Sequence, residues 1–328
     1  MTVSEFKNAE AADRFHVGYE QLLAKLWPAS RTMLDVPTRF GTTRVVRTGP
    51  GPGPGPGPRT GAGTGPGSGD PIVLLPASGG NALMWHRYVE ALSREHAVYA
   101  VDTVGEPGGS VQTAPIADGR DAAAWLEELL IGLGVTNAHI VGCSYGGWIA
   151  LKHQIHHPGR AAGLTLVDPA GFAEVGWRFY RWVILGGLAG LAPSPLRPRL
   201  ARAVHNSAIL DSDLMTLMRA SMGFRRRLPK TDVLTDEDLQ AVQAPAQFLL
   251  AARSAIHHSD QVAERIGRLL PAARVEVIPG TGHALSTDEP ELVTDRILKW
   301  PPPQDRTEPS HQKDDGQGAA GPPLAALG

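Results

Sequence analysis

Residues 138–146 read Ala-His-Ile-Val-Gly-Cys-Ser-Tyr-Gly, an apolar run followed at once by a serine between two glycines. The apolar run predicts a buried strand. Gly142 and Gly146 allow a sharp turn at Ser144, because a side chain at either position would collide with the neighbouring strand or helix. This pattern is typical of a nucleophile elbow, in which a strained strand-to-helix turn presents a serine. Ser144 is therefore the candidate nucleophile.

Around this stretch, strand-like apolar runs alternate with helix-like patterns along most of the chain. Alternation of this kind is the signature of βαβ units, so we predict an α/β fold with a mostly parallel central sheet and helices on both faces. The predicted strands of the parallel sheet cover residues 72–75, 97–101, 138–141, 163–167, 247–251 and 274–278.

The chain has 328 residues, of which 42% are hydrophobic, enough for a sizeable core. Two segments are too rich in Gly, Pro or polar residues to offset the entropy cost of ordering them, so we expect them to be disordered. The expected organisation begins with an N-terminal helix and opening hairpin (1–48, the hairpin using 38–40 and 42–46) and a disordered loop (49–70). The α/β core (71–170) follows, then a helical cap (171–240), the C-terminal part of the core (241–300) and a disordered tail (301–328).

The charge balance excludes some kinds of partner. A formal net charge of −2 leaves no basic footprint for nucleic acid, and we interpret Arg225-Arg226-Arg227 as a solvated helix face. The longest apolar stretch, 177–191, is too short and too often interrupted to span a bilayer, so we expect no stable membrane insertion. Cys143 is the single cysteine, and residues 1–25 lack a signal-peptide pattern, so we expect a cytoplasmic protein. The oligomeric state stays open.

A serine needs a neighbouring base, usually a histidine oriented by a carboxylate, to act as a nucleophile. Gly280-Thr281-Gly282-His283 follows the last predicted strand and precedes the last predicted helix. His283 is therefore expected on a loop at the same sheet edge as Ser144. Two other histidine groups, 153–157 and 257–258, lack the pattern of a metal site. We expect no cofactor and no metal.

Over residues 15–300 the chain resembles the serine α/β-hydrolases, and in particular the single-domain bacterial carboxylesterases. The resemblance rests on the serine turn, on Gly282-His283, on Val36-Pro37-Thr38-Arg39-Phe40-Gly41, on Gly79-Gly80-Asn81 leading to Met84-Trp85, and on Tyr99-Ala100-Val101-Asp102. It implies an α/β-hydrolase fold with Ser144 as nucleophile, His283 as general base and then acid, and an acyl-enzyme intermediate that water hydrolyses.

Two features of the site depart from the family pattern. The oxyanion needs two backbone amides as donors, and we expect Tyr145 to supply one of them. The second is expected from the loop after strand 72–75, where the family usually has His-Gly-x. Here the loop reads Pro-Ala-Ser, so the matching amide is that of Ser78. The usual acid position holds Ala255, and loss of an orienting carboxylate costs about ten-thousandfold in turnover. Asp168, at the end of strand 163–167, is the favoured substitute, and Asp260 is the alternative.

The sequence thus favours a serine esterase acting on a hydrophobic ester of modest size, with aromatic and leucine side chains of the cap forming an apolar pocket. Two alternatives stay open. One is a hydrolase-fold binding or signalling protein whose missing acid at 255 reflects lost catalysis. The other is a different serine-dependent chemistry of the fold, such as perhydrolysis, C–C bond cleavage or amide hydrolysis.

Overall fold

The structure, a computed structural model, describes residues 2–28, 30–51 and 69–300. A nine-stranded sheet runs through the molecule in the order β11-β10-β8-β7-β4-β5-β3-β2, with β6 paired to β3. Six neighbouring strands are parallel, which confirms the predicted fold class. These are β4 (Gly69–Leu75), β5 (His96–Val101), β7 (Ala138–Cys143), β8 (Ala161–Val167), β10 (Ala246–Arg253) and β11 (Arg274–Gly282).

The strands of the opening hairpin have other bounds than those predicted. Strand β2 (Arg31–Thr38) pairs antiparallel with β3 (Gly41–Thr48), and Arg39 and Phe40 form the turn between them rather than the end of a strand. Gly41 has a φ of +135°, a conformation that disfavours other residues, so it starts the second strand directly after the tight turn. The short strand β6 (Val111–Gln112) extends this antiparallel edge.

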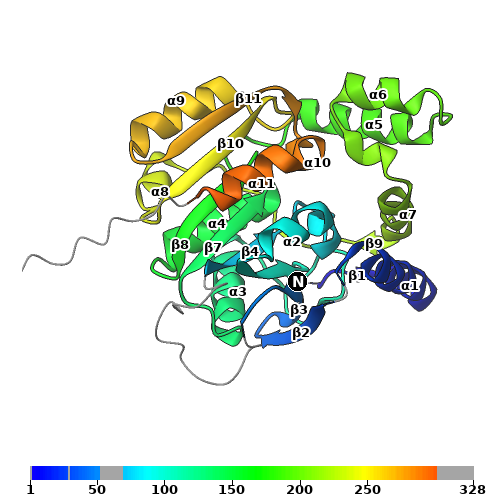
Figure 1. Ribbon diagram of the computed structural model, residues 1–328, viewed down its shortest axis with the longest axis horizontal. Helices are drawn as coiled ribbons and strands as arrows, with labels where there is room; N and C mark the ends of the chain where they lie inside the picture. Colours follow the sequence, from blue (N-terminus) through cyan, green and yellow to red (C-terminus); the bar gives the residue numbers. More distant parts are fainter. Residues whose placement is uncertain (1, 29, 52–68, 301–328) are drawn as a thin grey trace, which may run out of the picture.

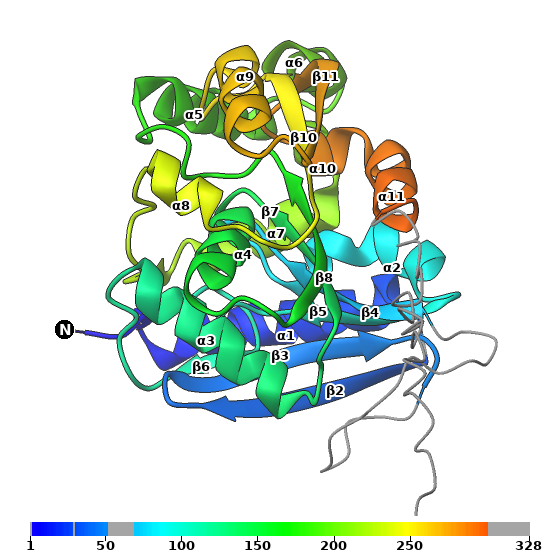
Figure 2. The ribbon, with the colours of Figure 1, turned by 90° about the vertical axis from the view of Figure 1, so that its left-hand side faces the viewer.

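Side chains of successive residues in the sheet enter different cores, as the period of two in a strand requires. In β4, Val73 and Leu75 belong to one buried cluster, and Ile72 and Leu74 to the other. The first cluster is covered by α3 (Gly119–Gly132), α4 (Tyr145–His156), α8 (Asp236–Gln240) and α9 (Ser259–Leu269). The second is covered by α1 (Ala9–Leu26), the 3₁₀ turn Ala82–Trp85, α2 (His86–Leu92), α10 (Leu285–Asp288) and α11 (Pro290–Leu298). Helices thus cover both faces, and α3 and α4 lie side by side (Figure 2).

Between β8 and β10 the chain leaves the alternating pattern. Helices α5 (Trp177–Leu191) and α6 (Arg197–Val204), a 3₁₀ turn (Ser207–Leu210) and α7 (Ser212–Ser221) follow one another, and Figure 1 shows α5 and α6 together at one side of the molecule. The short strand β9 (Phe224–Arg225) then pairs with β1 (Glu5–Phe6). Few side chains of this insertion are buried; its own small cluster consists of Ala189, Ala201, Ile209 and Met215.

The predicted disordered tail, 301–328, and most of the predicted disordered loop, 52–68, lie outside the described residues. Within the described ranges, no helix combines the length and apolar character that crossing a bilayer requires.

Candidate active site

Three parallel strands end at the same edge of the sheet, and each delivers one predicted site residue. Ser144 follows β7, Asp168 follows β8, and His283 follows β11. The carboxyl ends of parallel strands form the usual ligand-binding edge of an open α/β sheet. Because β7 pairs with β8 and β10 lies between β8 and β11, the order of the strands brings the three side chains together.

Ser144 occupies a strained turn between β7 and α4. Its φ of +49° is unusual for a residue with a side chain. A Cβ at Gly142 would lie 2.5 Å from the carbonyl oxygen of Gly146, and one at Gly146 would collide with that of Leu75. Both glycines are therefore needed for close backbone packing, and the turn aims the serine out of the strand at the head of α4.

Hydrogen bonds link the three side chains in series. His283 Nε2 lies 3.0 Å from Ser144 Oγ, and His283 Nδ1 lies 2.6 Å from Asp168 Oδ2. A carboxylate can only accept, so Nδ1 carries the proton and donates to Asp168. This tautomer leaves the lone pair of Nε2 free to accept the proton of the serine hydroxyl.

Asp168 is fully buried and has several donors around it. Its Oδ1 accepts from the Ala251 amide at 3.0 Å, and Oδ2 accepts from Ser254 Oγ at 2.8 Å in addition to His283. His257 Nε2 lies 3.3 Å from Oδ1, in a direction poor for a straight hydrogen bond. Burial raises the pKa of Asp168, but the contacts with His257 and His283 outweigh burial and hold that pKa well below its usual range. The carboxylate is therefore ionised at neutral pH.

The structure does not bring the alternative acid to the histidine. Asp260 is exposed in the first turn of α9 and makes no hydrogen bond or ion pair with His283 within the described part of the chain. Ala255, at the usual acid position, is buried beside this site, and its neighbour Ser254 donates to Asp168 instead.

The two predicted oxyanion donors line one cavity together with the serine. Tyr145 begins α4, and Ser78 lies on the loop after β4. Buried Glu106 fixes this loop: its carboxylate accepts from Ser78 Oγ at 3.1 Å and from the Gly79 amide at 3.0 Å. The loop that carries the Ser78 amide is therefore held in place by a buried carboxylate.

Arg226 also binds Glu106, and its position corrects our interpretation of Arg225-Arg226-Arg227. Residues 225–227 do not form a helix face: Arg225 ends β9, and Arg226 lines the cavity. Arg226 Nε donates to Glu106 Oε1 at 2.7 Å, and its guanidinium lies 4.6 Å from the centre of the Tyr145 ring. The solvated-helix interpretation was wrong because tertiary pairing with a buried carboxylate outweighs the hydration of one arginine.

Sequence reasoning missed Glu106 as a site residue and passed over His257. Glu106 lies a few residues beyond the end of β5, at the same sheet edge as the serine, and that position was the available signal. His257 was considered only as a metal ligand, yet it is buried against Asp168. Among the described residues, no group of three or more His, Cys, Asp or Glu side chains is arranged to hold a metal ion.

A cavity of about 420 Å³ opens in front of Ser144. Its apolar wall includes Ala170, Val175, Phe179, Tyr180 and Ile256, and Arg226 and Lys230 form part of its polar side. Phe179 and Trp182 of α5 also make T-shaped contacts with the His283 ring, with ring centres 5.9 and 5.5 Å away. Helix α5 of the insertion therefore covers the histidine.

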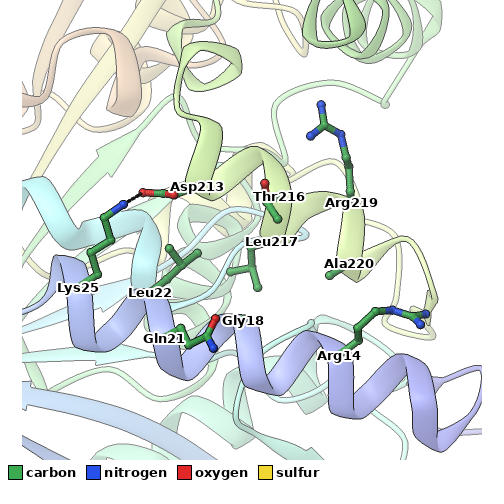
Figure 3. Close-up of a pocket in the computed structure, with 10 residues that line it drawn as sticks. All are labelled: Arg14, Gly18, Gln21, Leu22, Lys25, Asp213, Thr216, Leu217, Arg219 and Ala220. Atoms are coloured by element: carbon green, nitrogen blue, oxygen red, sulfur yellow. Dashed lines mark hydrogen bonds and ion pairs between the residues drawn. The ribbon is translucent and has the colours of Figure 1, made fainter.

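A larger groove of about 560 Å³ lies elsewhere, between α1 and α7. Figure 3 shows its lining, in which Lys25 Nζ pairs with Asp213 at 2.6 Å. None of the predicted catalytic or oxyanion residues lines this groove. Size alone therefore does not identify the site, whereas the side chains around Ser144 do.

Comparison with known proteins agrees with this architecture. The sequence profile of the alpha/beta hydrolase family matches residues 72–296, more than half of the chain. The chain belongs to the alpha/beta hydrolase family. It is 26% identical to carboxylesterase YbfK of Bacillus subtilis (strain 168) over 307 residues, covering 90% of this chain and 96% of that protein. The crystal structure of naproxen esterase from Bacillus subtilis superposes with a TM-score of 0.73 at 25% identity, covering 89% of this chain and 98% of that one. The chain is thus a carboxylesterase-like member of the family.

Proposed function

We propose that the protein is a serine carboxylesterase that cleaves small hydrophobic esters through an acyl-enzyme intermediate. The observation that carries the proposal is the series of hydrogen bonds from Ser144 Oγ to His283 Nε2 at 3.0 Å and from His283 Nδ1 to Asp168 at 2.6 Å. The similarity to two Bacillus subtilis proteins named as carboxylesterases supports the reaction class.

In the proposed mechanism, Ser144 Oγ attacks the ester carbonyl carbon while His283 Nε2 takes the hydroxyl proton. Asp168 keeps the imidazole in the required tautomer and stabilises the imidazolium. The amides of Tyr145 and Ser78 donate to the oxyanion of the tetrahedral intermediate. His283 then gives its proton to the leaving alkoxide, which departs as the alcohol. A water, deprotonated by His283, hydrolyses the acyl-enzyme and restores Ser144.

The substrate preference follows from the cavity wall. Phe179, Tyr180 and Ile256 offer apolar surface in a cavity of about 420 Å³, which suits a hydrophobic ester of modest size. Turnover of a series of p-nitrophenyl esters is expected to rise from acetate to medium-length acyl chains. Best turnover at the most polar member would contradict this preference.

Active-site labelling with a fluorophosphonate probe tests the proposed nucleophile and base. Wild type should be labelled at Ser144, Ser144→Ala should not be labelled, and His283→Ala should be labelled much more slowly. Ser221→Ala is the control, since the Ser221 hydroxyl on α7 donates to the Met218 carbonyl and contacts no residue of the site. Labelling that persists in Ser144→Ala would overturn the assignment.

The binding-protein alternative depended on Ala255 at the usual acid position. Asp168 beside His283 Nδ1 argues against that alternative, because it supplies the orienting carboxylate from a neighbouring strand. The same ester series, extended to amides and to peracid formation, separates the esterase from other serine-dependent chemistries.

A further inference from the structure

Helix α5 is apolar on two sides but buries only one of them. The inner side includes Phe179 and Trp182, which face His283, and the buried residues Gly186, Ala189 and Gly190. The opposite side presents large apolar side chains to solvent at spacings of seven, four and three residues. These residues, the outer stripe, are Trp177, Ile184, Leu188 and Leu191, with exposed fractions between 52% and 71%. Tyr180 is also exposed, but it lines the cavity in front of Ser144 and is not part of the stripe.

An exposed apolar helix face of this length needs an explanation. A helix that is hydrophobic all round is ordinarily buried, and contiguous apolar patches on a protein surface mark interaction sites. Val183 and Leu185 widen the patch on the same helix. In Figure 1, α5 and α6 stand away from the edge hairpin β2–β3, so the described part of the sheet does not cover them.

The charge of the same region is one-sided. Residues 175–210 contain five arginines and no aspartate or glutamate, although the whole chain has a formal net charge of −2. The ion pairs of the described residues include none of these five arginines, although Arg178 donates to the Ser254 carbonyl and Arg197 to the Ala192 carbonyl. Arg181, Arg199 and Arg202 are exposed, and Arg181 lies on α5 within the face that carries the outer stripe.

An exposed apolar stripe together with nearby arginines favours one class of binding partner over others. A second copy of the chain docked face to face through the outer stripe would bring two acid-free, arginine-rich surfaces together, which electrostatic repulsion opposes. Nucleic acid would meet the arginines but leave the apolar stripe without a partner. An apolar face bordered by cations, lying in the interface between headgroups and acyl chains, is the pattern of helices that bind anionic lipid surfaces.

We propose that the outer stripe of α5, with Arg181, Arg199 and Arg202, docks the protein reversibly on anionic lipid surfaces. The stripe enters the boundary between headgroups and acyl chains, and the arginines contact the anionic headgroups. This inference does not depend on the proposed catalytic roles, because none of Ile184, Leu188 and Leu191 lines the cavity in front of Ser144.

Sedimentation of the full chain with lipid vesicles tests the proposal. Wild type should bind vesicles of phosphatidylcholine with 30% phosphatidylglycerol, bind pure phosphatidylcholine vesicles more weakly, and lose affinity as salt rises. The triple variant Ile184→Ser, Leu188→Ser, Leu191→Ser should bind at least about tenfold more weakly, because three apolar side chains no longer enter the interface. Each of Arg199→Gln and Arg202→Gln should weaken binding by about fivefold.

The matched control is Val17→Ser, Val111→Ser, Ile131→Ser, which removes three comparably exposed apolar side chains elsewhere, with exposed fractions of 58%, 60% and 54%. It should bind like wild type. Thermal unfolding and circular dichroism establish that each variant is folded. Failure of wild type to sediment with anionic vesicles, or equal binding by the two triple variants, would overturn the proposal. A dimer in sedimentation velocity that the α5 variant abolishes would overturn it too, since a second copy would then cover the stripe.

Discussion

Ser144, Asp168 and His283 follow strands that are buried on both faces of the sheet. Helix α5, which covers His283, buries only one of its two apolar faces. The first region is surrounded by two large core clusters. The second has one small cluster of four residues. The proposed chemistry thus depends on the part of the molecule with the most buried contacts.

This contrast has a physical consequence for motion. Regions with few buried apolar contacts open at lower free-energy cost than the core does. The insertion is therefore the part expected to move when a substrate enters, while the strand ends keep the distance of 3.0 Å between Ser144 and His283. Pre-organised groups on rigid elements are what transition-state stabilisation requires.

The largest expected effect is the loss of turnover on changing Asp168 at the sheet edge. Asp168→Asn should lower kcat for a soluble ester by about ten-thousandfold, because an amide can donate to His283 Nδ1 and so favour the wrong tautomer. Asp260→Asn is the matched control and should keep wild-type kcat, since Asp260 is exposed and away from His283. Full turnover by Asp168→Asn would show that another group orients the histidine.

A pair of leucine substitutions compares the packing of the two regions. Leu74→Ala, in the fully buried strand β4, should lower the free energy of unfolding by about 2 to 5 kcal/mol through lost burial and a residual cavity. Leu188→Ala, on the exposed face of α5, should change it by no more than about 0.5 kcal/mol. Chemical denaturation of both variants measures the difference. Equal losses would mean that the outer face of α5 is packed in solution.

Much of the rigid region could be predicted from the sequence because local patterns encode it. The strand runs, the turn at Ser144 and the loop at His283 each depend on neighbours in the chain, and Asp168 could be placed because it ends a strand. The structure brings these three residues together, while their catalytic roles remain predictions. The bounds of the opening hairpin were wrong, because the turn lies at Arg39 and Phe40, before Gly41, rather than at Gly41.

Contacts between distant parts of the chain could not be predicted in this way. Glu106 accepts a hydrogen bond from Ser78, 28 positions before it, and pairs with Arg226, 120 positions after it. No local pattern encodes such a contact. Likewise, the apolar residues of α5 were recognisable in the sequence, but which of them face the site and which face solvent depends on how the helix docks.

Glu106 connects the sheet edge with the insertion, because it binds Ser78 on the loop after β4 and Arg226 directly after β9. Glu106→Gln should lower kcat by about a hundredfold with a smaller change in KM, because the Ser78 amide loses its fixed position and Arg226 its charged partner. Steady-state kinetics of a soluble ester separates kcat from KM. Glu95→Gln, an exposed glutamate, is the control. A change confined to KM would argue that Glu106 shapes only substrate binding.

The smallest expected effect concerns a buried histidine in the rigid region. His139 in β7 is buried next to Thr165, and burial lowers its pKa to about 3. In the unfolded chain this residue has a pKa near 6.5, so it is protonated below that pH, whereas in the folded chain it stays neutral. The free energy of unfolding therefore falls as the pH drops below about 6.5. His139 should contribute about 1 kcal/mol of lost stability between pH 6.5 and pH 5.5. His139→Gln should remove this part of the pH dependence, whereas exposed His16→Gln should not. Urea unfolding at several pH values measures the slope, and identical slopes for His139→Gln and wild type would mean that His139 takes up its proton without unfolding.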